Sequence, residues 1–415
     1  MSTPLNHRDA MPAIVADYCP MMPTYGAPTA TFVRGKGTEL WDQDGKRYLD
    51  FLSGLAVTSL GHAHPVVAEA IASQASTLLH LSNLFANDNA WRVAVTLNEL
   101  LGGDGQVFFC NSGGEANDAA LKLARKWGGR GRHNIISAFG SFHGRTLATL
   151  HMTGQPAKHE AFWPLPEGFR HAAWGDAADL ERMVDDTTCA IMLEPVQGEG
   201  GVNPAPKGYF EDVRRLCDER SLLFMVDEVQ TGFGRTGKWF GYQHFLPEGV
   251  RPDVVSMAKA LGNGFPIGAC WAKREVAAAF KPGDHATTYG GTPLATAAAN
   301  AVLGVMREID APALAARAGA RLSLALEKVD GVSFVRGLGL LLAVELDGVA
   351  SAPVQTRLME LGCITNAITP TALRLAPPLT LSDAEIDEGA ALIAQAIADV
   401  RVAAAVAVAV AKGAS

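Results

Sequence analysis

Short apolar runs without polar alternation recur through the middle of the 415-residue chain. Strands buried on both faces of a parallel sheet need such runs, because neither side of the strand meets water. Helical spacing of apolar and charged residues lies between the runs, at 115–127 and 209–220. The pattern therefore predicts an α/β fold, with a mostly parallel central sheet and helices on both of its faces. The expected strands lie at 107–110, 135–138, 190–193, 222–226 and 254–257.

The sequence pattern changes near residue 297. Long Ala/Leu-rich segments of helical character begin there, and a hydrophobic, hairpin-like stretch follows at 332–346. These features predict a smaller α+β C-terminal domain. We expect a large domain over 63–296, a small domain over 297–415, and an N-terminal segment, 1–62, that packs with the small domain. The Ala/Val-rich run at 402–411 is too short to cross a membrane and is expected to end a C-terminal helix.

Composition excludes several classes of partner. The net charge is −8 and there is no basic arm, which argues against nucleic acid as a partner. The N-terminal residues, which include Arg8, Asp9 and Asp17, lack the apolar stretch of a secretory signal. Six scattered cysteines without a C-x-x-C pair indicate reduced thiols rather than a disulfide or zinc framework. We therefore expect a cytoplasmic protein that binds no membrane and no metal.

Ligands of open parallel sheets bind beyond the carboxyl ends of the strands. After the run at 107–110 come Asn111, Ser112, Gly113, Gly114 and Glu115, a small-residue turn that opens a helix. Its amides suit a phosphate. A plain helix cap at Ser112, with Glu115 completing a capping box, explains the same residues.

The acidic side chain of Asp227 and the amide side chain of Gln230 follow the run at 222–226. Asp227 is placed to meet a ligand in the crevice, although strand-end acids also cap helices or pair with bases. Lys259 is the only charged residue between 254 and 272. Desolvation lowers the pKa of such a lysine and favours a Schiff base with a carbonyl cofactor. The alternative is a lysine whose stem covers apolar surface while its ammonium reaches water.

Arginines stand in similar isolation. Arg374 is the only charge between Glu360 and Asp383, and a guanidinium there suits a carboxylate. Arg145 is a second candidate clamp, and the nearby Phe142 offers a flat face for a ring. The acids that could pair with these arginines, or form purely structural ion pairs, are Glu194 and Glu199.

Two motifs compete with these interpretations. Residues 232–237 spell G-F-G-R-T-G and Asp253 follows about twenty residues on, as in a dinucleotide-binding unit. Five residues, DEVQT, separate the strand from the first glycine, and no convincing helix follows the motif, so a glycine turn is favoured instead. His62 and His64 could bind a metal, but no further ligand cluster accompanies them, so we expect satisfied polar histidines.

Six ordered stretches, over about residues 25–388, together resemble the class III pyridoxal-phosphate aminotransferases. They are NSGGEAN from Asn111, FHGRT from Phe142, EPVQGEGG from Glu194, DEVQTGFGRTG from Asp227, KALGNGFPIGA from Lys259 and TTYGGTPLA from Thr287. The resemblance implies the type I fold of pyridoxal-phosphate transferases and the cofactor pyridoxal 5'-phosphate.

The resemblance also implies roles at the cofactor. Lys259 would bind it as a Schiff base and then move the proton between substrate and cofactor. Asp227 would keep the ring nitrogen protonated, Gln230 would contact the ring oxygen, and Phe142 would stack on the ring. The phosphate would be held by Ser112, Gly113, Gly114 and, from the neighbouring subunit of a homodimer, Thr288.

Substrate roles follow in the same way. Arg374 would hold the α-carboxylate of glutamate or 2-oxoglutarate, and Glu199 would mask Arg374 while the other substrate is bound. Arg145 would hold the distal carboxylate end of the amino donor. Thr287 and Asn366 are further candidate substrate contacts.

Within the family, the motifs look closest to those of acetylornithine aminotransferases. Leu55 stands where ornithine aminotransferases carry a tyrosine, which argues against free ornithine. The resemblance thus implies transfer of the δ-amino group of N2-acetylornithine to 2-oxoglutarate, in arginine biosynthesis. Alternatives are a succinylornithine, 4-aminobutyrate, ornithine or N-succinyl-diaminopimelate donor, an aminomutase, or a nicotinamide oxidoreductase built on residues 232–237. The sequence departs from the common family pattern near the site at Gly114, Asn263, Ala286 and Thr292.

Overall fold

The centre of the molecule is a seven-stranded sheet with the strand order β4-β12-β11-β10-β7-β5-β6. The computed structural model describes residues 21–413, with side chains up to residue 406. All strands run parallel except β12, which is antiparallel to both of its neighbours. The strands are β4 Gly105–Cys110, β5 Asn134–Ala138, β6 Phe169–Ala172, β7 Thr188–Leu193, β10 Leu223–Asp227, β11 Val254–Met257 and β12 Gly268–Lys273.

Alternate residues of the central strands enter two different cores. On β10, Leu223 and Met225 pack with helix α4 (Gly113–Gly128), whereas Phe224 and Val226 pack with α7 (Tyr209–Arg220) and α9 (Pro293–Glu308). All four side chains are almost completely buried. Burial on both faces explains why the runs show no polar alternation, and the mostly parallel α/β sheet is confirmed.

The sequence did not predict β6 or β12. β12 lies inside the long apolar stretch that follows Lys259, where composition alone does not separate two strands from one. The chain reverses between β11 and β12 through η4 (Lys259–Leu261) and a glycine-rich turn, so β12 returns antiparallel, with Ser256 opposite Cys270. The reversal leaves Lys259 at the end of β11.

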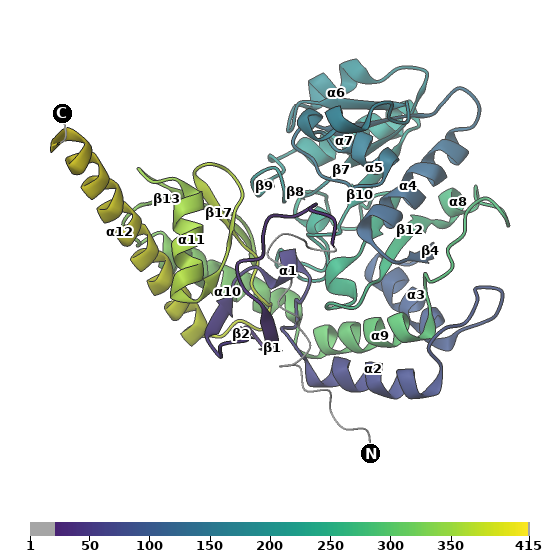
Figure 1. Ribbon diagram of the computed structural model, residues 1–415. Helices are drawn as coiled ribbons and strands as arrows, with labels where there is room; N and C mark the ends of the chain where they lie inside the picture. The colour runs from purple at the N-terminus through teal and green to yellow at the C-terminus, as the bar shows by residue number, and fades with distance from the viewer. Residues whose placement is uncertain (1–20, 414–415) are drawn as a thin grey trace.

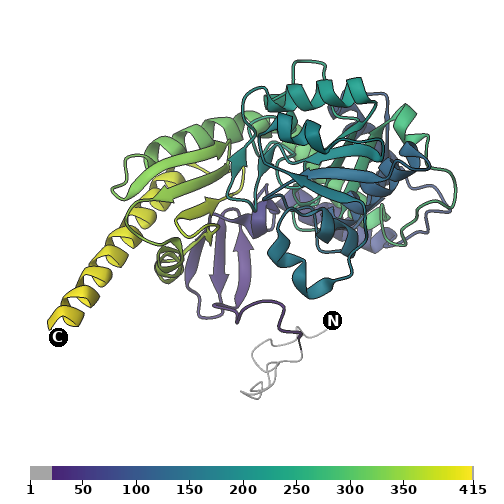
Figure 2. The same cartoon turned by 90° about the horizontal axis from the view of Figure 1, so that it is seen from above.

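The N-terminal strands join the far end of the chain. β1 (Phe32–Lys36), β2 (Glu39–Asp42) and β3 (Arg47–Asp50) form a small sheet whose last strand is β15 (Cys363–Ile364). Figure 2 shows the purple N-terminal strands beside the yellow-green C-terminal elements. After α1 (Ser53–Ala56) the chain enters α2 (Pro65–Thr77) and α3 (Asp88–Leu100), which pack against α9.

A second lobe, which we call the C-terminal lobe, comprises α10 to α12 and a four-stranded sheet ordered β13-β14-β17-β16. It confirms the predicted hairpin and the smaller α+β part of the fold (Figure 1). Its elements are α10 Ala311–Leu326, β13 Val332–Leu338, β14 Leu341–Leu346, α11 Ser351–Leu361, β16 Asn366–Ala367, β17 Ala372–Leu375 and α12 Asp383–Gly413.

Helix α12 includes the predicted C-terminal run and extends beyond the body of the lobe (Figure 1). Among the described residues, this one helix is long and apolar enough to cross a membrane by length and composition. However, Ile386, Ile393 and Ile397 on its first part are fully buried in the core. That part of α12 is therefore a core helix rather than a membrane span.

Candidate active site

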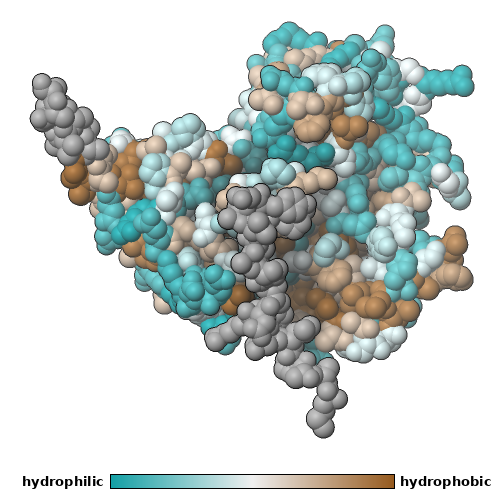
Figure 3. All heavy atoms as spheres, in the orientation of Figure 1, coloured by the Kyte–Doolittle hydropathy of each residue, from teal (hydrophilic) through white to brown (hydrophobic). Residues whose placement is uncertain are grey.

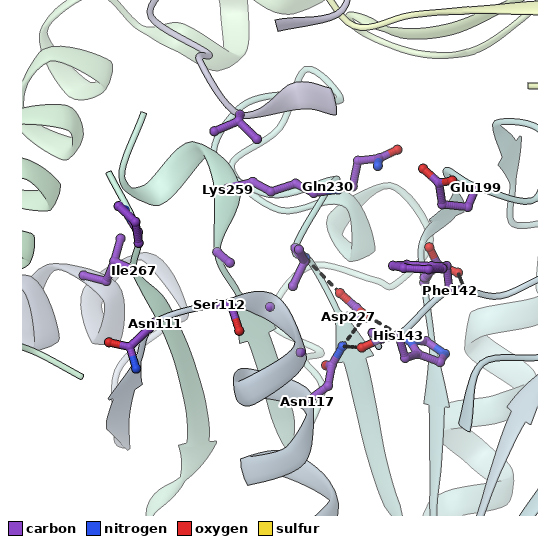
Figure 4. A pocket seen from close by; sticks show the side chains of 18 of the residues that line it. Asn111, Ser112, Asn117, Phe142, His143, Glu199, Asp227, Gln230, Lys259 and Ile267 are labelled. Atoms are coloured by element: carbon purple, nitrogen blue, oxygen red, sulfur yellow. Dashed lines mark hydrogen bonds and ion pairs between the residues drawn. The ribbon is translucent and has the colours of Figure 1, made fainter. Parts of the chain in front are cut away.

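A cavity of about 310 Å³ opens at the carboxyl ends of β4, β10 and β11. Figure 4 shows Lys259, Asp227, Gln230 and Phe142 around it. The residues that line it also include Ser112, Gly113, Gly114, Asn117, His143, Glu194 and Glu199. The predicted cofactor residues are thus brought together, except Thr288.

The start of α4 forms one wall of the cavity. Ser112 is its N-cap and accepts a hydrogen bond from the Glu115 amide at 3.2 Å, while the Glu115 carboxylate accepts one from the Asn111 amide at 2.6 Å. The cap therefore exists, although Glu115 reaches Asn111 rather than Ser112. Because first-turn amides have no partner within a helix, Gly113 and Gly114 still offer N–H groups to an anion.

The two glycines differ in the space around them. A Cβ on Gly113 would lie 2.8 Å from Val229, so this position needs glycine. A Cβ on Gly114 would meet no atom closer than 3.9 Å. Gly114 therefore departs from the family pattern without a steric reason.

Asp227 ends β10 and is 4% exposed. Its Oδ2 accepts hydrogen bonds from Asn117 Nδ2 at 2.7 Å and His143 Nδ1 at 2.9 Å, and its Oδ1 accepts from the Val229 amide at 3.0 Å. Figure 4 marks these contacts with dashed lines. Sequence reasoning missed Asn117 and His143, although both lie inside the motifs that carried the family resemblance.

Lys259 follows β11 with a φ of +43°, a conformation that L residues rarely adopt. Strain of this kind is typical of functional sites. Burial lowers the pKa of Lys259 from 10.5 to about 8, against the opposing effect of Glu199. The side chain lines the cavity rather than the outer surface, which disfavours the alternative of a lysine reaching bulk water.

Gln230 lies on the same cavity and is 9% exposed. Its Oε1 has no hydrogen-bond partner among the described residues. Buried polar atoms are rarely left unpaired, so this oxygen indicates a missing ligand group. Gly198 makes the placement possible, since a Cβ there would lie 1.8 Å from the same oxygen.

Arg374 on β17 is 2% exposed and points to the loop after β8 (Val196–Gln197). It donates to Glu199 Oε1 at 2.5 Å and to Asn366 Oδ1 at 2.8 Å. Burial opposes ionisation of Glu199, but the charge and hydrogen bond of Arg374 outweigh it and lower the Glu199 pKa. The structure therefore places Arg374, Glu199 and Asn366 in one ionic cluster.

Glu194 does not pair with an arginine in the described chain, contrary to one of the two expected pairings. It is 6% exposed and accepts a hydrogen bond from the Phe142 amide at 3.1 Å. Burial and then the charge of Asp227 raise the pKa of Glu194 well above its usual range. Glu194 thereby ties the backbone at Phe142 to the residues that follow β7 (Thr188–Leu193).

Besides Arg374 and Asn366, three predicted residues do not line the cavity. Arg145 is exposed, and its guanidinium lies 5.5 Å from the centre of the Phe142 ring. Thr288 is exposed as well. Thr287 accepts hydrogen bonds through Oγ1 from the Gly290 amide at 3.1 Å and from Asn111 Nδ2 at 3.4 Å.

The segment before α2 contains an unusual turn. Ser53, Gly54, Leu55 and Ala56 all have positive φ, which costs roughly 1–2 kcal/mol for each non-glycine residue. Leu55 is 37% exposed beside the cavity, and Val57 lines it.

Two of the family departures make hydrogen bonds to the backbone: Asn263 supports the segment that follows this turn, and Thr292 supports the chain near Leu79. Asn263 has a φ of +46°, which asparagine tolerates, and its side chain accepts from the Leu60 amide at 2.7 Å and donates to Gly61 O at 3.1 Å. Thr292 precedes α9 and donates through Oγ1 to Leu79 O at 2.9 Å. Nothing in the structure explains Ala286.

The competing motifs do not form ligand sites in the described chain. Residues 232–237 form turns and open no α-helix, so they lack the geometry of a dinucleotide unit. His62 Nε2 pairs with Asp50 Oδ2 at 2.7 Å, as expected of a satisfied histidine, whereas His64 Nδ1 has no partner, contrary to that expectation. Within residues 21–413, no group of three His, Cys, Asp or Glu residues could hold a metal ion.

Comparison with known proteins agrees with this site. Residues 21–397 match the family model "Aminotransferase class-III". The chain is 48% identical over 389 residues to an acetylornithine aminotransferase from Corynebacterium efficiens, covering 91% of this chain and 95% of that protein. A succinylornithine transaminase from Salmonella paratyphi A is 44% identical, with coverage of 89% and 92%. The ornithine aminotransferase of Toxoplasma gondii, solved with partial occupancy of pyridoxal phosphate, superposes with a TM-score of 0.86 at 33% identity, covering 92% of each chain.

The chain therefore belongs to the class III aminotransferases, enzymes that exchange an amino group between an amino donor and a keto acid. The cofactor of this family is pyridoxal phosphate. The residues present fit it: an anion-binding helix start, a buried carboxylate, an unpaired amide oxygen on Gln230 and a lysine with a lowered pKa face one cavity.

Proposed function

We propose that this enzyme transfers the δ-amino group of N2-acetylornithine to 2-oxoglutarate, giving N-acetylglutamate semialdehyde and glutamate. The observation that carries the proposal is the Arg374–Glu199 pair beside the Lys259 cavity. A removable countercharge lets one site accept a dicarboxylate and a donor that lacks the second carboxylate. The acetylornithine aminotransferases at 45–48% identity support the choice of donor.

The cofactor end of the site is assigned to five side chains. When bound, pyridoxal phosphate supplies an aldehyde for the amine and a ring that takes up an electron pair. Lys259 Nζ would hold the cofactor covalently and, once released, would take a proton from the substrate carbon. Asp227 keeps a proton on the ring nitrogen, Gln230 faces the ring oxygen, and Phe142 stacks on the ring. The amides of α4, with Ser112, hold the phosphate.

The substrate end works by exchange of partners. With glutamate or 2-oxoglutarate, Glu199 leaves Arg374, which then binds the α-carboxylate through two charge-assisted hydrogen bonds. With the acylated donor, Glu199 stays on Arg374 and cancels its charge. Arg145 binds the distal carboxylate, and Asn366 keeps the Arg374 guanidinium oriented in both cases. Leu55, where a tyrosine would favour free ornithine, leaves room for an acyl group.

We also propose that the enzyme is a homodimer with shared active sites. Thr288 is exposed and does not line the cavity of its own chain, as expected of a residue that binds the phosphate in the neighbouring subunit. Exposed apolar side chains gather near it, and Figure 3 shows such side chains toward the lower right of the view. Leu79, Leu84 and Phe85 are exposed in the segment whose Asn83 donates to Thr287 O at 3.1 Å. Buried reduced cysteines support a cytoplasmic location.

The test is a single-turnover absorbance titration of the purified holoenzyme. N-acetylornithine, N-succinylornithine, ornithine, 4-aminobutyrate and glutamate are compared in parallel. Efficient conversion by N-acetylornithine and glutamate supports the proposal. A clear preference for N-succinylornithine or another amine would replace the donor, and sustained multiple turnover of a donor without any added keto acid would indicate an aminomutase.

A further inference from the structure

Arg235 is a buried cation without a countercharge. It lies in the turns after β10 and is 1% exposed. Burial lowers its pKa to about 9, and no described Asp or Glu forms an ion pair with it. A buried charge without a countercharge destabilises the folded state unless hydrogen bonds compensate it. Such a residue is retained where its hydrogen bonds serve a purpose.

Those hydrogen bonds tie three segments together. Nη1 donates to Leu340 O at 3.1 Å and to Pro377 O at 2.5 Å, and Nη2 donates to Ser59 Oγ at 3.0 Å. The Arg235 carbonyl also accepts from the Leu340 amide at 2.9 Å. Arg235 thereby joins the turns after β10 to the N-terminal segment and to the C-terminal lobe.

The two carbonyls lie just outside strands β14 and β17, and Arg374 is on β17. Leu340 immediately precedes β14, in which Ala343 pairs with Arg374, and Pro377 follows β17. On its other side, Arg235 continues the segment that places Asp227 and Gln230. One planar guanidinium therefore holds the segments that flank β14 and β17 against the turns that follow Asp227 and Gln230.

We propose that Arg235 is a positioning residue that sets the place of Arg374 relative to the cofactor cavity. This inference rests on the proposed role of Arg374 in binding the α-carboxylate of glutamate. It also gives residues 232–237 a function: their turns place Arg235 between the lobes rather than binding a dinucleotide.

The test compares Arg235→Lys and Arg235→Met in the two half-reactions of the holoenzyme. We expect the single-turnover rate constant with glutamate to fall at least about tenfold more than that with N-acetylornithine, because only glutamate needs Arg374. Lysine keeps the charge and part of the hydrogen bonding, so it should rescue part of the loss. Equal losses in both half-reactions, or no loss, would overturn the proposal.

Two controls separate positioning from general damage. Arg214 on α7 is also a buried arginine, and it forms ion pairs with Asp218 and Asp253. Arg214→Met should lower Tm without changing the ratio of the rate constants of the two half-reactions. If Arg235→Met does not fold, Arg235→Lys decides the question by the same ratio. Arg374→Lys must itself be selective against glutamate. If Arg374→Lys slows both half-reactions equally, the proposed carboxylate clamp is wrong. If Arg374→Lys is selective against glutamate but the Arg235 variants are not, only the positioning role of Arg235 is wrong.

Discussion

The two ends of the active site are built differently. At the cofactor end, Asn117, His143 and the Val229 amide converge on Asp227, and all of these groups lie on or beside the large sheet. At the carboxylate end, Arg374 comes from the C-terminal lobe and meets Glu199, whose side chain is 29% exposed. Several hydrogen bonds fix the first arrangement. The second is an ion pair with Glu199 and a hydrogen bond to Asn366, and we propose that the ion pair exchanges with the substrate.

This difference follows from what each end has to bind. A permanent cofactor is served best by preorganised groups that need no rearrangement during reaction. Two substrates of different charge need a clamp whose state can change, and the cost of the change must be small. A partly exposed carboxylate meets that requirement, because water can replace the arginine.

The largest expected effect is the loss of turnover when Lys259, at the cofactor end, is substituted. Lys259→Ala removes both the covalent link and the proton carrier, so turnover should fall by at least about a thousandfold. Cofactor binding should weaken but persist, since Asp227, Gln230 and the start of α4 remain. The measurement is kcat together with cofactor absorbance after gel filtration. Lys273→Ala, which removes a lysine paired with Asp253 at the end of β12, should keep nearly full activity.

Substitution of Arg374 should slow the two half-reactions to different extents. Arg374→Ala removes the α-carboxylate pair and should slow the glutamate half-reaction about 10- to 100-fold more than the N-acetylornithine half-reaction. Glu199→Gln leaves the guanidinium unmasked and should instead penalise the acylated donor. Stopped-flow rates with each substrate measure both effects. Parallel losses in the two half-reactions would contradict the exchange scheme.

Two glycine variants sharpen the contrast within the cofactor end. Gly198→Ala pushes a methyl group against Gln230 Oε1 and should weaken cofactor binding about tenfold. Gly114→Ala meets no close atom and replaces a helical glycine, so Tm should stay equal or rise slightly. Cofactor titration and thermal unfolding provide the two measurements. Weaker cofactor binding in Gly114→Ala than in Gly198→Ala would refute the steric explanation.

Sequence reasoning predicted the parts of the site that depend on local order. Runs of buried residues placed the strands, and ligand groups follow strand ends in parallel sheets, so Asp227, Gln230 and Ser112 could be found before the fold was known. The charge isolation of Lys259 and Arg374 reflects their burial in the same direct way.

The parts that sequence could not supply are contacts across the fold. Pairing of Glu199 rather than Glu194 with Arg374 depends on where the loop after β8 meets the C-terminal lobe. The bonds of Asn117 and His143 to Asp227 join helix α4 and the loop after β5 to the end of β10, and they leave no periodic signal. The reversal into β12 was hidden because its glycines resemble those of an ordinary loop.

The smallest expected effect is a shift in the pKa of Lys259, at the cofactor end, caused by the charges of Glu199 and Arg374 at the carboxylate end. Lys259 must be unprotonated to attack an aldehyde, so covalent attachment of pyridoxal phosphate to cofactor-free protein should speed up with pH and level off above about 8, rather than near 10.5. Glu199 raises the pKa of Lys259 and Arg374 lowers it. Glu199→Gln should therefore move the midpoint to lower pH, and Arg374→Met should move it to higher pH, each by about a fraction of a unit.

The midpoint is read from the rate of absorbance change on mixing, in buffers of constant ionic strength. Glu248→Gln, a change far from the cavity, serves as the control and should leave the midpoint unchanged. Shifts of opposite sign in the two variants would show that the exchangeable pair tunes the lysine as well as binding the substrate. Identical midpoints would mean that burial alone sets the pKa of Lys259, and the two ends would then be electrostatically independent.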